Sequence, residues 1–232
     1  MERKNAKREP VVRAGLALLD ERGLDGLTLG AIAKALNVRA PSLYWRFNSK
    51  QDLVDEMATQ VVADWLVELK NLTADADWER WALTFATTFR DALRARRHGA
   101  RLVAGTHLKD NVLLDPLERA LRIFQSAGIG VSEAVLCIKT LYDFVIGFTL
   151  EEQAVMPSTT VRDARYDLDQ RPARVGEGDY RLSIEAGPFL LDNFDARFND
   201  GVQMIIVGFA SRHHKDSSMP TKVSKARSRN GR

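Results

Sequence analysis

The stretch that decides the fold of this 232-residue chain is residues 28–50, TLGAIAKALNVRAPSLYWRFNSK. Thr28 is of a residue type that caps helices, and the apolar residues after it recur at helical spacing. Asn37 predicts a tight turn at the end of that helix, because asparagine tolerates the left-handed backbone conformation of a helix-ending residue. Pro41 fits the first turn of a second short helix, over residues 42–47. Helices this short need neighbours that hold them in place.

A longer helix is expected on each side of this stretch. The helix before it begins near Pro10 and ends at Gly23. The helix after it opens at Ser49, where Asp52 three residues later resembles a capping box, although the usual residue there is Glu. Its apolar face continues well past the end of a three-helix unit. We therefore expect residues 51–71 to link a head to a body.

The three helices expected in residues 1–50 make a helix-turn-helix, whose third helix lies in the DNA major groove while the second crosses the phosphate backbone. Charge favours the same partner. Residues 1–50 carry a net charge of +5 and residues 212–232 carry +6, whereas residues 51–211 carry −8, within a total of +3. A basic head and tail on an acidic body indicate ends that meet a polyanion, although charged blocks can also be simple solvated surface.

The body, residues 72–214, is expected to be helical as well. No stretch alternates apolar and polar residues between hairpin turns, so the chain is predicted to be all-α. Pro, Gly, Asp and Arg dominate the segment near 157–178, which predicts a long flexible loop, and Ser, Lys and Arg dominate the tail 215–232, which predicts disorder. The expected body helices cover residues 78–97, 102–107, 114–127 and 132–154, with two more after Ile184, one of them over 194–210.

Composition excludes several classes of protein. The sequence has no leader pattern and no run of roughly 18 apolar residues, which favours a cytoplasmic protein that does not enter membranes. Cys137 lies alone in an apolar stretch and is expected to be an inert hydrophobe. We expect no catalytic residues, no metal and no cofactor, because Cys137 has no histidine neighbour and no metal-ligand spacing links the histidines, His98, His107, His213 and His214.

The head resembles the TetR family of repressors, in the branch that responds to tetracycline, and the body resembles it more weakly. The head residues that carry the resemblance are Gly26-Leu27-Thr28, Ala33, Leu36, Val38, Pro41-Ser42-Leu43-Tyr44-Trp45 and Lys50. Those in the body are Phe89-Arg90, Ala92-Leu93, Gly99-Ala100, Gly105-Thr106, Gly147, Leu150-Glu151, Gln153, Phe198, Gly201 and Gly208-Phe209. The resemblance implies a C-terminal helical domain that binds a small inducer between its helices and dimerises through a four-helix bundle.

On this placement Thr28, Tyr44 and Lys50 are interpreted as phosphate contacts, because hydroxyl and ammonium groups bind phosphate oxygens without identifying a base. The third helix is expected to contact bases. Serine can address several bases, proline can contact a thymine methyl, and arginine can fork onto guanine or bind phosphate. Trp45 has an alternative, which is packing against the linking helix. The expected base-contact residues are Pro41, Ser42, Trp45 and Arg46.

Two positions depart from the pattern that the resemblance implies. Gly30 and Ala40 stand where the tetracycline-responsive branch carries a base-contacting arginine and glutamine. Those bidentate contacts cannot be made here, and each is worth roughly 1–3 kcal/mol of discrimination between bases. We therefore expect a different operator. It remains double-stranded and palindromic, because a twofold dimer places two recognition helices in successive major grooves.

The inducer pocket is assigned to apolar and aromatic residues of the body, which can equally be plain core. Val103 and Phe85 stand where the branch uses a histidine and an asparagine for a magnesium chelate of tetracycline, and Glu151 alone does not make a magnesium site. We therefore expect a small apolar or aromatic inducer without metal. His107 can hydrogen-bond it or lie at the surface. The expected ligand-binding residues are Phe85, Phe89, Val103, His107, Phe124, Leu141 and Phe144.

Two body helices, residues 132–154 and 194–210, have apolar faces that need a partner, either each other or a second copy of the chain. Gly147, Gly201 and Gly208 favour close helix approach, and we expect a homodimer. The sequence thus predicts a sequence-specific DNA-binding transcriptional repressor that a small-molecule inducer releases from its operator. The alternative is a DNA-binding regulator that responds to a protein partner instead.

Overall fold

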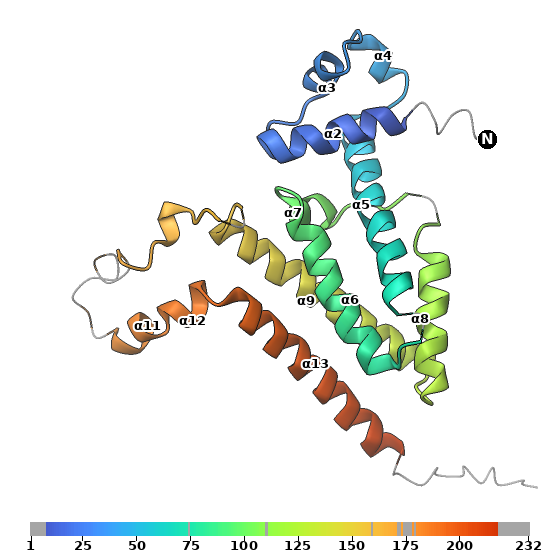
Figure 1. Cartoon of the computed structure of the whole chain (residues 1–232), viewed down its shortest axis with the longest axis vertical. Coiled ribbons are helices and arrows are strands. Elements are labelled where there is room, and N and C mark those ends of the chain that lie inside the picture. Colours follow the sequence, from blue (N-terminus) through green and yellow to red (C-terminus); the bar gives the residue numbers. More distant parts are fainter. Residues whose placement is uncertain are drawn as a thin grey trace, which may run out of the picture.

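The chain folds into a small helical head, at the top of Figure 1, and a larger helical body in the computed structural model. The structure describes residues 8–73, 75–109, 111–158, 160–170, 173, 178 and 180–217. Within these residues every regular element is a helix, apart from an isolated bridge between Ser158 and Val161, which confirms the all-α prediction. The head holds α2 (Glu9–Arg22), α3 (Leu29–Ala35) and α4 (Pro41–Tyr44), and α5 (Lys50–Leu72) runs from the head into the body.

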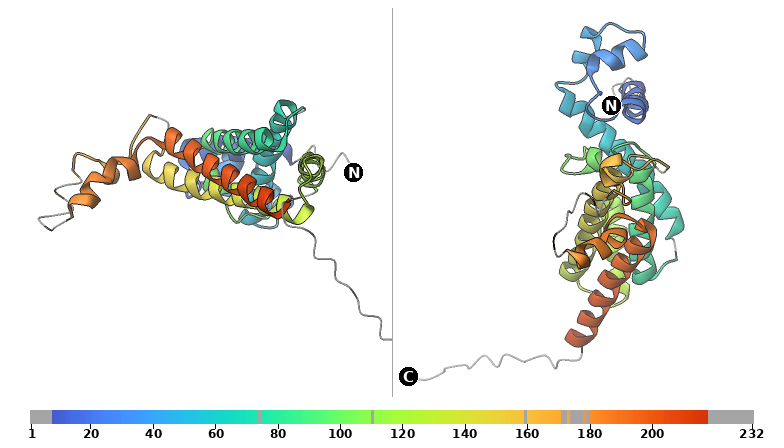
Figure 2. Two further views of the ribbon diagram at one scale, coloured as in Figure 1. Left: turned by 90° about the horizontal axis from the view of Figure 1, so that it is seen from below. Right: turned by 90° about the vertical axis from the view of Figure 1, so that its left-hand side faces the viewer.

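The body is built from α6 (Trp78–Arg94), α7 (Gly99–Val103), α8 (Leu114–Ser126), α9 (Val131–Val155) and α13 (Phe194–Ser217). The central helix is α6, which packs against α5, α9 and α13. Between α9 and α13 the chain forms η1 (Ala164–Tyr166), α11 (Arg181–Glu185) and α12 (Gly187–Leu191), which project sideways from the body (Figures 1 and 2). No helix in the described ranges is long and apolar enough to cross a membrane.

The recognition helix α4 is shorter than predicted, because it covers Pro41–Tyr44 instead of residues 42–47. Arg46 N and Phe47 N both donate to the Leu43 carbonyl oxygen, at 2.8 and 2.9 Å, so the helix closes in a turn there. This turn brings Phe47 back onto the head core, where it is fully buried.

The α6–α7 turn also differs from the prediction. The prediction ended one helix at residue 97 and began the next at 102, whereas α6 ends at Arg94 and α7 begins at Gly99. The chain doubles back so tightly that a Cβ at residue 99 would lie 2.1 Å from the Leu93 carbonyl oxygen. Glycine has no Cβ, so it avoids this clash. His98 enters this turn in the left-handed region, with φ 57°. The helix predicted over 102–107 therefore ends early, at Val103.

One continuous apolar face of α5 packs against the head at its start and against the body farther along. Leu53 and Met57 are fully buried in the head, and a Cβ at Gly15 of α2 would lie 2.8 Å from the Met57 sulfur. In the body Trp65 stacks near Phe89, with 4.3 Å between ring centroids, and its indole Nε1 donates to Thr88 Oγ1 at 2.9 Å. Helix α5 is therefore packed at both ends and connects the head directly to the body.

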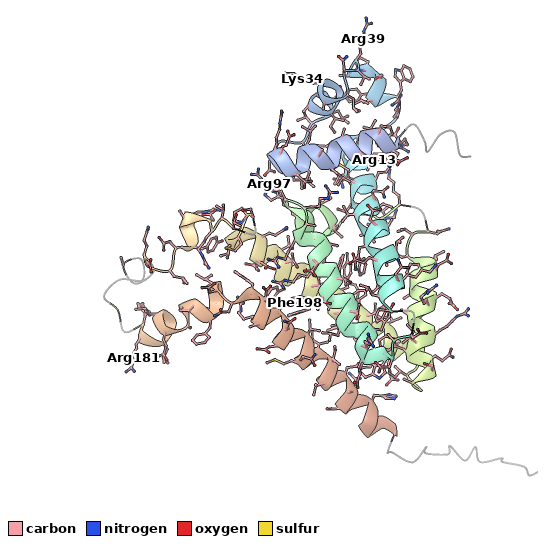
Figure 3. The ribbon with its side chains drawn as sticks, viewed as in Figure 1. Arg13, Lys34, Arg39, Arg97, Arg181 and Phe198 are labelled. Carbon is pink, nitrogen blue, oxygen red and sulfur yellow. The ribbon has the colours of Figure 1, made fainter. Side chains whose placement is uncertain are left out.

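A buried ion pair joins the body helices. The guanidinium of Arg90 on α6 donates to both carboxylate oxygens of Glu152 on α9, at 2.8 and 2.6 Å, and their side chains are only 6% and 3% exposed. Arg90 also pairs with Asp195 of α13 at 2.7 Å and lies 4.7 Å from the ring centre of Phe198, which Figure 3 labels. Two buried charges are tolerated here because each satisfies the other with bidentate geometry.

The predicted loop and tail are only partly within the structure. Helix α13 continues to Ser217, past the predicted end at residue 210 and into the segment expected to be disordered. Residues 218–232 of the predicted tail lie outside the described residues, as do residues 159, 171–172, 174–177 and 179 of the predicted loop. The loop does hold η1, whose first turn is capped by Asp163 Oδ1 accepting from Arg165 N at 2.9 Å.

Candidate DNA-binding and ligand-binding sites

Helix α4 presents an aromatic pair to solvent at the outer end of the head. Leu43 and Phe47 are fully buried and attach the helix to the head core. Tyr44 and Trp45, which lie between them in the sequence, point outward with 61% and 90% of their surface exposed. Large aromatic side chains exposed to this extent are typical of surfaces that bind a partner. The alternative in which Trp45 packs against the linking helix is therefore wrong.

The turn between α3 and α4 is held by backbone hydrogen bonds. Asn37 has φ 53°, which confirms the left-handed turn predicted there. Its N–H donates to the Lys34 carbonyl oxygen at 3.1 Å, and Val38 N–H donates to the Ala33 carbonyl oxygen at 2.9 Å. These two bonds form a Schellman motif, which sets the direction in which the chain leaves α3 and enters α4.

The predicted DNA-contact residues lie on α3, on α4 and at the start of α5. Thr28 is exposed, and its Oγ1 caps α3 by accepting from Ala31 N at 3.1 Å. Gly30 faces open space, since a Cβ there would meet only Thr28 Oγ1, at 4.0 Å. Lys50 Nζ donates to the Leu24 carbonyl oxygen at 3.4 Å. The remaining predicted residues, Ala40, Pro41, Ser42, Tyr44, Trp45 and Arg46, belong to α4 and its two ends.

Two cations at the outer end of the head were missed by the sequence prediction. Figure 3 shows Lys34 and Arg39 extending outward there, and both are exposed. Neither forms an ion pair with any residue that the structure describes. Lys34 lies on α3, the helix expected to cross the phosphate backbone, and Arg39 lies directly before the recognition helix α4. These two positions are the sequence signal that could have identified them.

The body holds the head through the α6–α7 turn, in a set of contacts we call the α6–α7 latch: Arg96, Arg97, His98 and Arg101. Arg96 pairs with Asp20 at 2.5 Å, and Arg101 pairs with both carboxylate oxygens of Asp25 at 2.9 and 3.0 Å. Arg97 Nη1 donates to the Glu21 carbonyl oxygen at 2.9 Å. Figure 3 shows Arg97 between the top of the body and α2. These contacts fasten the end of α2 and the α2–α3 loop to the body.

The latch is in turn held by α9. The side-chain amide of Gln153 donates to the Leu93 and Arg96 carbonyl oxygens, at 3.1 and 2.9 Å, and its oxygen accepts from Ala100 N at 3.1 Å. Gln153 follows Glu152 of the buried ion pair in the sequence. A short chain of polar contacts therefore connects α9 to the head through the latch.

A second connection joins the α7–α8 segment to the head. Lys109 forms ion pairs with Asp52 and Glu56 of α5, and its backbone N–H donates to Thr59 Oγ1 at 2.7 Å. Arg8, directly before α2, pairs with the same two carboxylates at 3.1 and 2.9 Å. The two acidic side chains thus bridge a head residue and a body residue.

The residues predicted to bind the ligand lie mostly in the packed core of the body. Phe85, Phe89, Phe124, Val103 and Leu141 are buried. Phe144 is half-buried against Phe198, and His107 is exposed. None of the seven lines either of the body clefts described next.

The larger body cleft, of about 850 Å³, opens between α5 and α8. Its apolar lining includes the buried side chains of Leu66, Leu69 and Trp81, and its rim is charged. A smaller, polar cleft of about 450 Å³ lies where α9 ends and α13 begins, and Arg94, Glu152 and Arg162 line it. The larger cleft has the size and apolar lining of a small-molecule site, and it touches the helix that carries the head.

Comparison with known proteins decides the family. A family model described as "Bacterial regulatory proteins, tetR family" matches residues 11–57, and one described as "Tetracyclin repressor-like, C-terminal domain" matches residues 72–212. The chain belongs to the TetR family. As a TetR-family protein it is a DNA-binding transcriptional regulator, and the two matched segments cover most of the head and body described above.

Curated relatives support this assignment over most of their length. The Escherichia coli "Tetracycline repressor protein class A from transposon 1721" is 35% identical over 208 residues, which cover 87% of this chain and 89% of the relative. The class C tetracycline repressor of Escherichia coli is 31% identical over 207 residues, which cover 87% and 90%.

Solved TetR structures have the same fold. A possible TetR family transcriptional regulator from Streptomyces coelicolor A3(2) superposes with a TM-score of 0.76 at 33% identity, over 88% of this chain and 99% of that one. The structure described as "TetR(class A) in complex with 5a,6-anhydrotetracycline and magnesium" gives 0.61 at 31% identity, over 87% and 96%.

The residues of this TetR-family chain do not fit a magnesium chelate. Val103 and Phe85, where the resemblance places a histidine and an asparagine, are buried apolar side chains. In the described ranges no three His, Cys, Asp or Glu side chains come together as possible metal ligands. Glu151 is exposed, and a single carboxylate cannot hold magnesium.

Proposed function

We propose that this chain represses transcription by placing α4 in the major groove of a palindromic operator, and that a small apolar or aromatic molecule in the body releases it. The observation that carries the proposal is the exposure of Trp45, 90% of whose surface faces solvent beside the fully buried Phe47. An indole left in water on a helix whose neighbours are well packed is placed for a partner. The Schellman turn and the short α4 supply the geometry of a helix-turn-helix.

Residue roles on the DNA follow from this placement. The hydroxyls of Thr28 and Tyr44 and the ammonium of Lys50 contact phosphates and set the register of the head. The weak 3.4 Å bond from Lys50 Nζ to a backbone carbonyl leaves its other donors available. Residues of α4 contact the bases, namely Pro41, Ser42, Trp45 and Arg46.

A second copy of the chain supplies the other half of the operator. Met204 and Val207 of α13 are exposed, at 75% and 58%, and Gly208 on the same face has nothing within 4 Å of a Cβ position. On α9, Leu136 is exposed and Gly147 is equally open. Each of the two helices thus has exposed apolar side chains and an open glycine that allows close approach of another helix. This arrangement favours a four-helix bundle formed by α9 and α13 of two copies.

The inducer occupies the cleft between α5 and α8. Leu66, Leu69 and Trp81 would contact its apolar or aromatic part, and the charged rim would meet its polar groups. A ligand there contacts the body half of α5 directly. It therefore favours an arrangement of the dimer in which the two heads no longer match successive major grooves of the DNA. DNA affinity then falls by thermodynamic linkage. No step of this release requires a metal.

The test begins with selection of operator sequences from a random duplex library by the full chain. We expect an inverted repeat, and a set of flat apolar compounds should contain some that both raise the melting temperature and weaken operator binding. Ile123→Trp, which fills the cleft, should abolish both ligand effects but leave operator binding intact. Gln125→Trp, on the exposed side of the same helix, is the matched control.

Two results would contradict parts of this proposal. If the chain selects no sequence, the repressor function is wrong. If it selects an operator but no compound shifts the melting temperature or the DNA affinity, small-molecule control is wrong and the alternative of a protein partner replaces it.

A further inference from the structure

We infer that Arg39 is a base-reading residue that sets operator sequence, an inference that rests on the proposed DNA-binding function. Arg39 directly precedes Ala40, the N-cap of α4. In a helix-turn-helix the N-terminal end of the recognition helix is the part that meets base edges. Figure 3 shows the Arg39 side chain at the outermost end of the head, pointing away from the body.

Within the part of the chain that the structure describes, the Arg39 guanidinium has no ion-pair partner, unlike several other arginines. Arg13 pairs with Glu9, Arg96 with Asp20 and Arg101 with Asp25. Among the described residues no carboxylate lies within ion-pairing distance of Arg39. Binding DNA would therefore break no internal ion pair of Arg39.

The backbone of Arg39 is held in place relative to α4. Its carbonyl oxygen accepts from Ser42 N at 2.9 Å and from the Ser42 hydroxyl at 2.7 Å. On the other side, the left-handed Asn37 and the Schellman bonds fix the turn. Only the side-chain torsions remain to be ordered on binding, which lowers the entropy lost per contact.

Two positions of the head, Gly30 and Ala40, cannot hydrogen-bond a base through their side chains. Gly30 has no side chain, and Ala40 is short and half-buried against the head core. Neither offers a hydrogen-bond donor to a base. A guanidinium matches O6 and N7 of guanine with two donors, so Arg39 specifies a G·C pair at the step next to the α4 contacts.

Lys34 provides the contrasting case on the same end of the head. It lies on α3, the helix that crosses the phosphate backbone, and an ammonium is a point charge without fork geometry. We therefore assign Lys34 to phosphate and Arg39 to a base.

The experiment uses the full chain and the operator selected by it. Arg39→Ala and Arg39→Lys are each measured on that operator and on the three alternatives at every base pair, at several salt concentrations. Arg39→Ala should reduce the preference for guanine at one position per half-site by about 5- to 150-fold, and Arg39→Lys, which lacks the planar fork, should reduce it by less. Arg39→Lys should keep the salt slope of the parent, because it keeps the charge. Arg13→Ala, whose side chain lines the groove between α2 and α5, is the control and should change neither quantity.

Two outcomes overturn the inference. Arg39→Ala could weaken binding to all sequences equally and lower the salt slope by about 0.9, with Arg39→Lys restoring both, which would make Arg39 a phosphate contact. Alternatively, both variants could select the parent operator unchanged. If the parent chain selects no operator at all, the proposed function itself fails, and this is seen before any variant is measured.

Discussion

His98 of the body and Leu24 of the head are joined by a hydrogen bond across the boundary between the two parts: the imidazole Nδ1 accepts from the Leu24 backbone N–H at 3.1 Å. Only the neutral imidazole can accept this bond, since a protonated Nδ1 is a donor. The groups facing the ring are the guanidinium groups of Arg97 and Arg101 and the carboxylate of Asp25. Partial burial, followed by the two guanidinium groups, lowers the pKa of His98 below its ordinary value of 6.5.

A pH dependence of stability follows from this contact. Above the unfolded pKa of about 6.5 both states hold a neutral His98, so it adds no pH dependence. As pH falls below that value the unfolded chain takes up the proton first, and stability decreases until the lower folded pKa is passed. The melting temperature should therefore drop between pH 7 and pH 5 more in the parent than in His98→Asn, an exchange that keeps an acceptor and tolerates the left-handed backbone. Parallel curves for the two proteins would contradict the role of His98.

Trp45 and Phe47 should respond oppositely to truncation. Because Trp45 is 90% exposed, Trp45→Ala should change the free energy of unfolding by less than about 0.5 kcal/mol but weaken operator binding. Phe47 is fully buried, so Phe47→Ala should cost about 3–5 kcal/mol of stability. Urea unfolding and an electrophoretic mobility assay separate the two effects. A large stability loss in Trp45→Ala would show that its ring packs in the folded head.

The buried pair of Arg90 and Glu152 predicts a second contrast, between a buried and an exposed carboxylate. Glu152→Ala leaves a buried guanidinium without its main partner and should cost about 3–5 kcal/mol of unfolding free energy. Asp195 is 77% exposed, so Asp195→Asn should cost less than about 1 kcal/mol although it also contacts Arg90. Denaturant titration measures both. Equal effects of the two substitutions would mean that burial does not decide the strength of this cluster.

The exposed stripe on α13 predicts an effect on assembly. Met204→Glu introduces a charge on a side chain that is 75% exposed in a single copy, so the isolated fold should tolerate it. In a dimer formed through α9 and α13 the same charge is buried without a partner, and the dimer should dissociate. Sedimentation velocity would report the change in mass. A parent chain that is monomeric, or a variant that stays dimeric, would place the interface elsewhere.

The single cysteine gives a chemical prediction. Burial raises the pKa of the Cys137 thiol to about 12, so at pH 8 almost none of it is thiolate. A thiol reagent such as 5,5′-dithiobis(2-nitrobenzoate) should react slowly with the folded chain and rapidly after denaturation. Fast reaction of the folded protein would show that this part of α9 opens.

Local rules predicted much of the head. The positions of Thr28, Asn37 and Ser49 as cap, turn and cap are properties of neighbouring residues, and the structure places a helix start or a left-handed turn at each of them. The same rules misplaced the α6–α7 turn. That turn is set by the close approach of Gly99 to the Leu93 carbonyl and by Gln153 from α9, a residue far away in the sequence.

The candidate sites divide in the same way. The DNA-contact residues could be proposed from one contiguous stretch, because they lie on successive short helices. The ligand residues could not, because aromatic spacing such as Phe85 and Phe89 does not distinguish a cavity wall from a filled core, and both are buried among other rings. The cleft between α5 and α8 arises from how two helices diverge, a property of no single segment.

The sequence by itself therefore determined the helix-turn-helix, the all-helical body and the loss of donors at Gly30 and Ala40, since each depends on residue type and short spacing. Only the tertiary structure decided that Trp45 is exposed, that no carboxylate of the described residues pairs with Arg39, and that His98, Arg96 and Arg101 fasten the head to the body. The physical reason is range. Helix caps and turns are formed by bonds across a few residues, whereas burial, ion pairing and clefts depend on which distant helices meet.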